Sequence, residues 1–505
     1  MVTSAGERSE EEAEKIRAAI DTFLRESKSP VAFEPGEEQI ALAPGSFELT
    51  CNGNRVMLQI WDRTRNLTRR VTAITGTKPG RLELTVERFG KKTGSLQLLD
   101  VARPQAMQKA QLEGRKTWRE TFRRLLSKLY PQWRIATLSN EPDLHNTLSP
   151  TYPRALLIEG MRGMAAIGVP PNANDPDGVL AFGLIWLDYL RRRETKLFID
   201  QLVLLMPAGS ERNTGLRLLY LNTEAVRFQL LVYSEEGFVD AVELRDVGNL
   251  DTRLPARFWP VPAEWNETDE LSRQISRMDQ VEAVEVDDGI SFRVRGLEFA
   301  KRTKEKVRFG IDSRHDARYS NVGEIERLAA ELAQRRVNTS PDRNNPLYLR
   351  NPEAWLESQV RKYVSELDAN LHPRPIYGQV PAFAGIDRGV IDLLAMERSG
   401  RLVVLELKAS EDLQLPLQAL DYWLRVKWHL DRNEFTAKGF FPGLAIARQA
   451  PRLVLIAPSL AFHPTTETIL RYFSPAIDVE RIGVGMLWRR NIQVAFRLQG
   501  SKSPE

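Results

Sequence analysis

The apolar positions of the first hundred residues change from a helical to a strand-like period. Ile16, Ile20 and Leu24 recur at a spacing of four after a polar start. Residues 31–102 then contain short runs in which apolar and polar residues alternate, and turn signals such as Asn-Gly and Pro-Gly separate these runs. We therefore expect residues 1–104 to form a helix and a small β-rich domain, either a barrel or a curled sheet.

The middle of the chain mixes helical and strand-like patterns. A basic amphipathic helix is predicted within residues 105–135, and strands are predicted on either side of a helix at 179–190. Residues 105–255 therefore predict an α/β domain, in which no set of catalytic residues is evident. Residues 256–346 predict two strands, a helix and a turn-rich linker to the last domain.

Three ionisable residues interrupt the apolar runs of the last predicted domain, residues 347–505. Asp392 lies in one run, and Glu406 and Lys408 lie in the next. Burying these side chains between apolar residues is costly unless they pair with each other or bind a metal. Because the three fall within seventeen positions of the chain, they indicate a functional site.

The two apolar runs predict a β-hairpin. Residues 390–396 and 401–408 are rich in Val, Leu and Ile, and a glycine ends the three-residue loop between them, where glycine is favoured. Pairing centred on Ser399 places Asp392 directly opposite Glu406. Side chains in such a pair have Cβ atoms about 4.5–5.5 Å apart on the same face of the sheet.

Two carboxylates at this separation repel each other unless a cation lies between them. Carboxylate oxygens suit Mg²⁺ or Mn²⁺, with water molecules in the remaining positions. Lys408 follows Glu406 at the strand period of two and therefore shares its face. A lysine beside a metal can orient or deprotonate a water molecule, or neutralise charge on a phosphate. The sequence therefore predicts a metal site formed by Asp392 and Glu406.

This constellation resembles the PD-(D/E)XK nuclease superfamily, which has the restriction-endonuclease-like fold. Asp392 corresponds to the aspartate of that motif, although isoleucine precedes it in place of proline. Glu406-Leu-Lys408 corresponds to the (D/E)-X-K element. Gln418 and Tyr422 resemble the QxxxY motif of the RecB-like branch, and the hairpin is similar to the C-terminal domain of the NucS mismatch endonucleases.

The resemblance covers about residues 350–460 and implies an α/β restriction-endonuclease-like sandwich for residues 347–505. It also implies a glutamate on a helix before the first core strand. Residues 351–367 predict such a helix, with asparagine as N-cap and proline at the first position. Glu357 borders the apolar stripe of this helix and is the expected third metal ligand. Glu353 lies in the first turn, where a carboxylate favours the helix dipole in any case.

Each of these motifs also has a plainer interpretation. An alternating Glu-Leu-Lys is often a solvated strand edge, and Gln418 and Tyr422 could simply form the polar face of a helix. Two cations farther along that helix, Arg425 and Lys427, are expected to contact phosphates. In the sharper alternative, the fold is retained but no longer cuts nucleic acid.

Composition sets limits on the function. The 505 residues predict two to four domains, and the net charge of +4 permits nucleic-acid binding. Arg119 and Arg123 on the basic helix could contact phosphates, although a solvated helix face is the commoner explanation. The one cysteine excludes an internal disulfide framework and a cysteine-rich zinc site. No run of 18 apolar residues and no signal peptide is evident, so we expect a cytoplasmic protein without a membrane partner.

The sequence thus predicts a multidomain protein with an N-terminal β-rich domain, a middle α/β region and a C-terminal α/β sandwich. We expect a Mg²⁺- or Mn²⁺-dependent nuclease that hydrolyses phosphodiester bonds in DNA, in repair or defence. Asp392 and Glu406 are the expected ligands, and Lys408 is expected to position the attacking water. Gln418 and Tyr422 are expected to orient the substrate or the active-site loop. The alternative is an inactive nuclease-fold protein that binds nucleic acid or serves as a scaffold.

Overall fold

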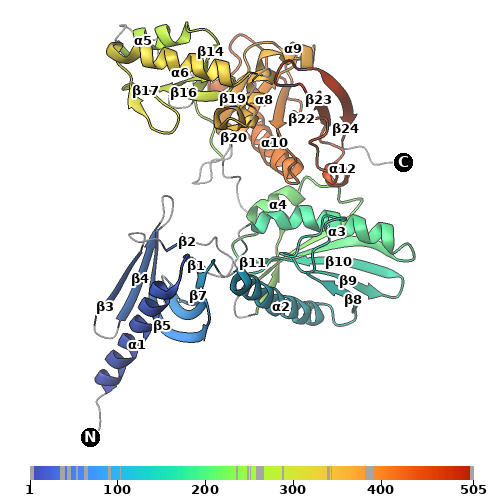
Figure 1. Cartoon of the computed structure of the whole chain (residues 1–505). Helices are drawn as coiled ribbons and strands as arrows, with labels where there is room; N and C mark the ends of the chain where they lie inside the picture. Colours follow the sequence, from blue (N-terminus) through green and yellow to red (C-terminus); the bar gives the residue numbers. More distant parts are fainter. Residues whose placement is uncertain are drawn as a thin grey trace. The chain divides into compact units, whose positions relative to one another are not determined.

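The chain forms two compact units in the computed structural model. The first comprises Met1–Glu211 and Phe228–Glu243, and the second comprises Arg212–Arg227 and Leu244–Glu505 (Figure 1). Each unit contains two sheets, so the predicted multidomain α/β architecture with a β-rich N-terminal part is confirmed. No helix among the described residues is long and apolar enough to cross a membrane. The structure describes residues 5–33, 40–42, 47–52, 55–61, 66–88, 92–102, 104–171, 173, 175–234, 237–246, 250, 252–256, 267–286, 289–337, 340, 342, 344–381 and 390–500.

The first sheet of the first unit is seven-stranded and antiparallel. In the described residues it is open, with β2 and β3 at its edges, so of the two expected forms these strands do not make the closed barrel. The apolar stripe of helix α1 (Ala5–Glu26) packs on the sheet through Ile16 and Ile20, as its spacing predicts. The strands are β1 (Pro30–Phe33), β2 (Ile40–Ala41), β3 (Phe47–Asn52), β4 (Arg55–Trp61), β5 (Asn66–Lys78), β6 (Arg81–Arg88) and β7 (Lys92–Asp100).

The second sheet of this unit has six strands in the order β13-β12-β11-β10-β9-β8. The predicted basic helix, α2, packs one apolar face on the sheet through Trp118 and Phe122. Gly183 brings helix α3 close to Ile167 and Leu204, which point to the other face. The elements are α2 (Pro104–Leu129), β8 (Arg134–Ser139), β9 (Arg154–Glu159), β10 (Arg162–Gly168), α3 (Val179–Arg193), β11 (Phe198–Pro207), β12 (Arg227–Tyr233) and β13 (Val239–Ala241).

The first sheet of the second unit is a five-stranded antiparallel meander. Helices α5 and α6 pack on it through apolar side chains such as Ile275, Ile325 and Leu332. Four of the residues expected in the linker after α6 lie outside the described residues. The elements are α5 (Glu267–Ser276), β14 (Val281–Val286), β15 (Gly289–Val294), β16 (Leu297–Arg302), β17 (Val307–Phe309), β18 (His315–Asp316) and α6 (Val322–Arg335).

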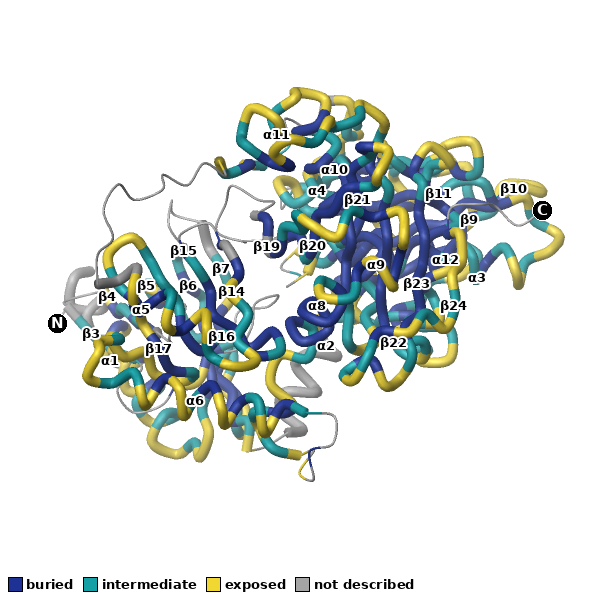
Figure 2. Tube along the Cα trace, turned by 90° about the horizontal axis from the view of Figure 1, so that it is seen from above, coloured by how far each residue is buried: buried dark blue, intermediate teal, exposed yellow. Residues whose placement is uncertain are grey.

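The second sheet of this unit has six strands in the order β19-β20-β21-β22-β23-β24, and β21, β22 and β23 run parallel. Strands β21 and β22 are buried on both faces, which explains their largely apolar sequences (Figure 2). The elements are α7 (Pro346–Leu349), α8 (Pro352–Lys362), α9 (Val364–Leu367), β19 (Tyr377–Pro381), β20 (Val390–Met396), β21 (Leu402–Leu407), α10 (Leu415–Asp431), α11 (Glu434–Ala437), β22 (Arg452–Pro458), α12 (Thr466–Leu470), β23 (Val479–Val484) and β24 (Val494–Gln499).

A buried arginine joins the two sheets of the second unit. Arg336, at the end of α6, is fully buried and lies 4.7 Å from the ring centre of Trp355 on α8. Its guanidinium donates to the carbonyl oxygens of Leu347 at 2.7 Å and of Arg295 at 3.1 Å. One side chain thus bonds the turn between β15 and β16 to helix α7, and the compact unit extends beyond the expected domain of residues 347–505.

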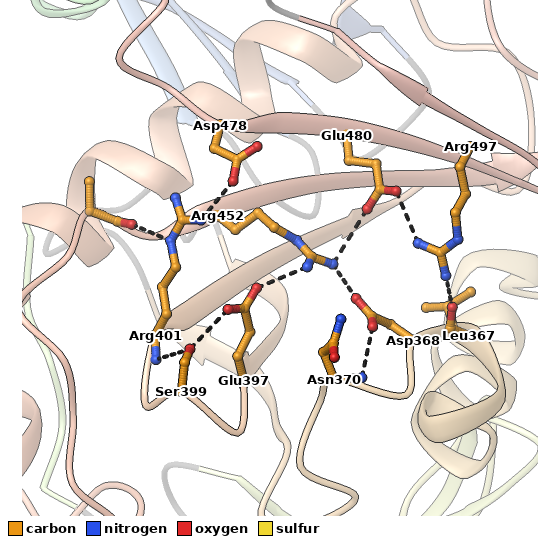
Figure 3. A network of polar contacts seen from close by, with 11 residues as sticks. Leu367, Asp368, Asn370, Glu397, Ser399, Arg401, Arg452, Asp478, Glu480 and Arg497 are labelled. Atoms are coloured by element: carbon orange, nitrogen blue, oxygen red, sulfur yellow. Dashed lines mark hydrogen bonds and ion pairs between the residues drawn. The ribbon is translucent and has the colours of Figure 1, made fainter.

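A network of ion pairs closes the edge of the sheet at which the parallel strands begin (Figure 3). Arg452, the first residue of β22, lies 2.5 Å from Asp368 and 2.9 Å from Glu397. Glu480 contacts the same guanidinium at 3.4 Å. These groups line a cavity of about 470 Å³. The arginines and acids of this network are paired with one another. We therefore interpret the network as stabilising the sheet at the edge opposite Lys408.

Candidate active site

The hairpin of β20 and β21 brings Asp392 opposite Glu406. The register pairs Leu393 with Leu405 and Met396 with Leu402, and the same register continued by one residue pairs the two acids as predicted. Leu393 and Leu405 point into the core beneath α8. The acids alternate with them and therefore point to the other face. The backbone N–H of Leu407 donates to Asp392 Oδ2 at 2.8 Å and holds its carboxyl group in place.

The hairpin loop depends on one glycine. Gly400 has φ +87°, and a Cβ atom there would lie 2.4 Å from the carbonyl oxygen of Ala445. The N–H of Gly400 donates to Glu397 O, and the N–H of Glu397 donates to Arg401 O, both at 2.8 Å. A tight loop of fixed length sets the register, and the register sets the acids opposite each other.

Lys408 lies just beyond the end of β21, where its backbone N–H donates to Ile456 O at 3.0 Å. Its ammonium group lies 3.7 Å from Glu406 Oε1 and 3.7 Å from Asp412 Oδ2. Glu353, in the first turn of α8, lies 4.0 Å away. The lysine is therefore surrounded by carboxylates and is only 12% exposed.

The acid pair is electrostatically strained. Burial raises the pKa of Asp392 to about 7, and the charges of Glu357 and Glu353 add to the increase. Burial also raises the pKa of Glu406 well above its usual value, as do the charge of Asp392 and a hydrogen bond to its side chain. Such a bond between two acids requires a proton. Oε2 of Glu406 is buried and has no hydrogen-bond partner.

Lys408 remains a cation in this setting. Burial lowers the pKa of Lys408, but the surrounding carboxylates, Glu406 foremost, raise it above the usual lysine value overall. Of the roles that the sequence left open for this lysine, the geometry therefore favours holding positive charge beside the acids. The role of deprotonating a water molecule is less well supported, because a lysine with a raised pKa is a weak base at neutral pH.

The residues of the predicted QxxxY motif lie beside the acids. Gln418 Nε2 donates to Tyr422 Oη at 3.1 Å across one turn of α10. Burial raises the pKa of Tyr422, and the nearby charges of Glu406 and Asp392 raise it further. The structure thus brings Gln418 and Tyr422 together with the acid pair.

Glu357, the expected third metal ligand, is close enough for its charge to raise the pKa of Asp392, and it also has two arginine neighbours. It lies on α8 as predicted, but its Oε1 forms an ion pair with Arg361 and lies 3.7 Å from Arg293 Nη1, which comes from β15. A Cβ atom on Gly378 of β19 would lie 2.6 Å from the same oxygen. The described residues contain no group of three or more His, Cys, Asp or Glu side chains placed to bind a metal ion.

The predicted phosphate-binding cations belong to two helices, one in each unit. Arg425 is 3% exposed and donates to the carbonyl oxygen of Asp421 at 2.7 Å, so it does not lie at the surface. Lys427 is paired with Asp431 at 2.6 Å. Both belong to α10. In the first unit, the basic helix α2 carries the other two cations, Arg119 and Arg123.

Both arginines of α2 have the same acidic neighbour. Arg123 Nε lies 2.9 Å from a carboxylate oxygen of Glu120, and Arg119 Nε lies 3.7 Å from the other. This arrangement agrees with the plainer interpretation of a solvated helix face, although it leaves contacts with phosphate open as a prediction.

Sequence reasoning missed three neighbours of the site. A carboxylate in the first turn of a helix is explained by the helix dipole, so Glu353 was not expected to have a further contact. In the structure it lies beside Lys408. Asp412 follows Lys408 by four residues but lies in a segment without a periodic pattern. Arg361 follows Glu357 at helical spacing, and this i,i+4 relation was the available signal for their ion pair.

Comparison with known proteins adds no identification, since no family model and no curated protein matches this chain.

Proposed function

We propose that this protein is a Mg²⁺- or Mn²⁺-dependent nuclease that hydrolyses phosphodiester bonds, with DNA as the expected substrate. The observation that carries the proposal is the buried pair of acids, Asp392 and Glu406, beside the cationic Lys408. Leaving two adjacent carboxyl groups buried, with one oxygen unpartnered, costs free energy. Such an arrangement is typical of functional sites, where the shifted pKa values of the side chains suit the reaction.

The acid pair fits a divalent cation. Mg²⁺ is commonly held by one or two carboxylates while water fills its other positions, so a third protein ligand is not required. Asp392 and Glu406 would hold the ion, which when bound would polarise a phosphate oxygen and make water a better nucleophile. The resemblance to the PD-(D/E)XK superfamily supports the same assignment. It also supports a restriction-endonuclease-like arrangement for the sheet of β19–β24.

The other residues of the site have distinct roles in this proposal. Lys408 stabilises negative charge on the phosphate as the P–O bond breaks. Tyr422, held by Gln418, restricts the position of the acid pair and orients the substrate. Glu353 and Asp412 keep Lys408 charged and located at the edge of the sheet.

A cleavage assay tests the proposal. Full-length protein is incubated with linear, nicked, mismatched, branched and single-stranded DNA in the presence of Mg²⁺ or Mn²⁺. Lys408→Ala should reduce cleavage by at least about 100-fold while nucleic-acid binding changes by less than about threefold, because the lysine acts on the reaction. Lys304→Ala, an exposed lysine in a turn between β16 and β17, serves as the control.

Two results contradict the proposal. Equal cleavage by wild type and Lys408→Ala would show that any activity comes from elsewhere. Binding of DNA without cleavage under any metal condition would favour the alternative, an inactive nuclease-fold scaffold.

A further inference from the structure

Three large apolar side chains are exposed on loops that follow the parallel strands of the candidate nuclease sheet. Leu460 follows β22 and is 75% exposed. Met486 and Leu487 follow β23 and are 55% and 59% exposed. Single exposed apolar residues are common, but three on neighbouring loops form a patch that requires an explanation.

These loops lie at the same edge of the sheet as the candidate active site. Lys408 follows β21, whose neighbour in the sheet is β22, and β23 comes next. The N–H of Ser459 donates to Val484 O at 2.8 Å, so the two apolar loops are joined to each other. With neighbouring strands about 4.8 Å apart, β23 lies about 10 Å from the strand that carries Glu406.

Backbone hydrogen bonds and a buried tryptophan hold the loop after β23. The N–H of Trp488 donates to Gly485 O at 3.0 Å, and the N–H of Arg490 donates to Leu487 O at 2.8 Å. Trp488 is 2% exposed and anchors the turn in the core beneath α8. Met486 and Leu487 are therefore exposed to solvent on a hydrogen-bonded turn.

The exposed charge beside this patch matches a nucleic acid. Arg490 is exposed, whereas the Arg489 guanidinium packs on buried rings, 4.3 Å from the ring centre of Trp488 and 5.4 Å from that of Trp355. A cation next to apolar side chains matches a strand that presents phosphates and base faces together. A paired duplex hides its base faces in the stack, so an apolar patch of this kind contacts bases only where they are unpaired or unstacked. Three side chains also provide much less area than the roughly 800 Å² per partner of a stable protein interface.

We propose that Leu460, Met486 and Leu487 form an apolar platform for unpaired bases, so that single-stranded or frayed nucleic acid is the preferred substrate. This inference rests on nucleic acid being the ligand in the proposed function. The platform contacts one or two bases while the neighbouring phosphate lies at the Asp392–Glu406 pair.

A binding experiment that does not require cleavage tests the platform. The triple variant Leu460→Ser, Met486→Ser, Leu487→Ser of the full chain is titrated with fluorescent single-stranded and blunt duplex DNA in EDTA. Affinity for the single strand should fall about 5- to 30-fold, and affinity for the duplex should change less than about twofold. The control is Leu144→Ser with Phe238→Ser, which removes two side chains that are 93% and 70% exposed in the first unit.

Several outcomes overturn the inference. They are an unchanged affinity for the single strand, an equal loss for single strand and duplex, and a change in oligomeric mass without a change in DNA affinity. The last result would identify the patch as a protein-binding face. Unfolding temperatures of both variants are measured alongside.

If the preference for unpaired bases is lost as expected but wild type cleaves no DNA, the nuclease proposal fails and the platform stands. If wild type cleaves DNA without any preference for unpaired bases, the platform fails and the nuclease proposal stands.

Discussion

At the scale of single residues, the buried acids make the metal-free protein sensitive to pH. The raised pKa values of Asp392 and Glu406 mean that the folded state holds a proton that the unfolded chain releases near pH 4. Stability is therefore full below about pH 4 and falls as the pH rises through about 7, the value for Asp392. The free energy of unfolding that is lost between these pH values comes from the burial and mutual repulsion of the two carboxylates. A bound cation would offset it.

Removing one of the two charges should remove this loss. We expect Asp392→Asn, in EDTA, to raise the free energy of unfolding at pH 8 by about 1–3 kcal/mol and to have little effect at pH 4. The asparagine oxygen still accepts from Leu407, so the local structure is kept. Urea unfolding at the two pH values measures the difference. The exposed Glu366→Gln is the control, and a destabilised Asp392→Asn at pH 8 would show that the pair is not strained.

Glu357 offers a test that separates support of the fold from metal binding. Its carboxylate contacts Arg361 and Arg293, both largely buried. We expect Glu357→Gln to destabilise the protein by about 2–4 kcal/mol, because two arginines lose a charged partner. Apparent Mn²⁺ affinity, measured calorimetrically, should change less than threefold, whereas Glu406→Gln should weaken it at least tenfold. A large loss of affinity in Glu357→Gln would instead make Glu357 the third ligand that the resemblance implies.

At the scale of elements, the loop between β20 and β21 controls the geometry of the site. We expect Gly400→Ala to cost about 2–4 kcal/mol, because a left-handed φ disfavours alanine and the added Cβ meets the carbonyl of Ala445. The hairpin must then shift, so cleavage should fall more than stability alone explains. Gly443→Ala is a matched control, since Gly443 has φ +77° but open space around its Cβ position.

The comparison of these two glycines isolates the contact from the backbone strain. Gly443→Ala should lose about 1 kcal/mol and retain activity once folded. Equal effects of the two substitutions on thermal unfolding and on cleavage would mean that the loop does not set the position of the acids.

At the scale of the whole molecule, the second unit depends on contacts between its two sheets. We expect Arg336→Met to reduce stability by about 3 kcal/mol or more, because several backbone carbonyls lose their donor and Trp355 loses a cation at 4.7 Å. Arg335→Met, the exposed neighbour, should change stability by less than about 0.5 kcal/mol. Thermal unfolding and limited proteolysis of the full chain measure both effects.

The same contacts bear on how the chain can be divided. A fragment of residues 347–505 lacks Arg336 and Arg293, and it also lacks Arg217, which forms a buried bidentate pair with Asp421 of α10 at 2.8 and 2.9 Å. We therefore expect that fragment to lack a cooperative unfolding transition. A cooperative transition in the fragment would show that the sheet of β19–β24 is an independent domain.

The local features of the site could be predicted from the residues of the hairpin and of α8. The alternation of residues and the short loop were enough to predict that Asp392 faces Glu406, because register follows from the loop length and the period of two. The start of α8 was also predictable, since the Asn351 side chain caps the helix at Ala354 N–H and proline follows it. The QxxxY contact followed in the same way from helical spacing.

The charged neighbours of these residues come from elements that are distant in sequence and meet only in the folded chain. Arg293 approaches Glu357 from another sheet, and Arg217 and Asp421 meet across 204 positions of the chain. Pairing over such distances cannot be predicted from a local period, because a period shows only which residues share a face of one helix or strand. For the same reason the pattern could not show that Glu353 lies beside Lys408, or which side chains the folded sheet leaves exposed at the edge that carries Lys408.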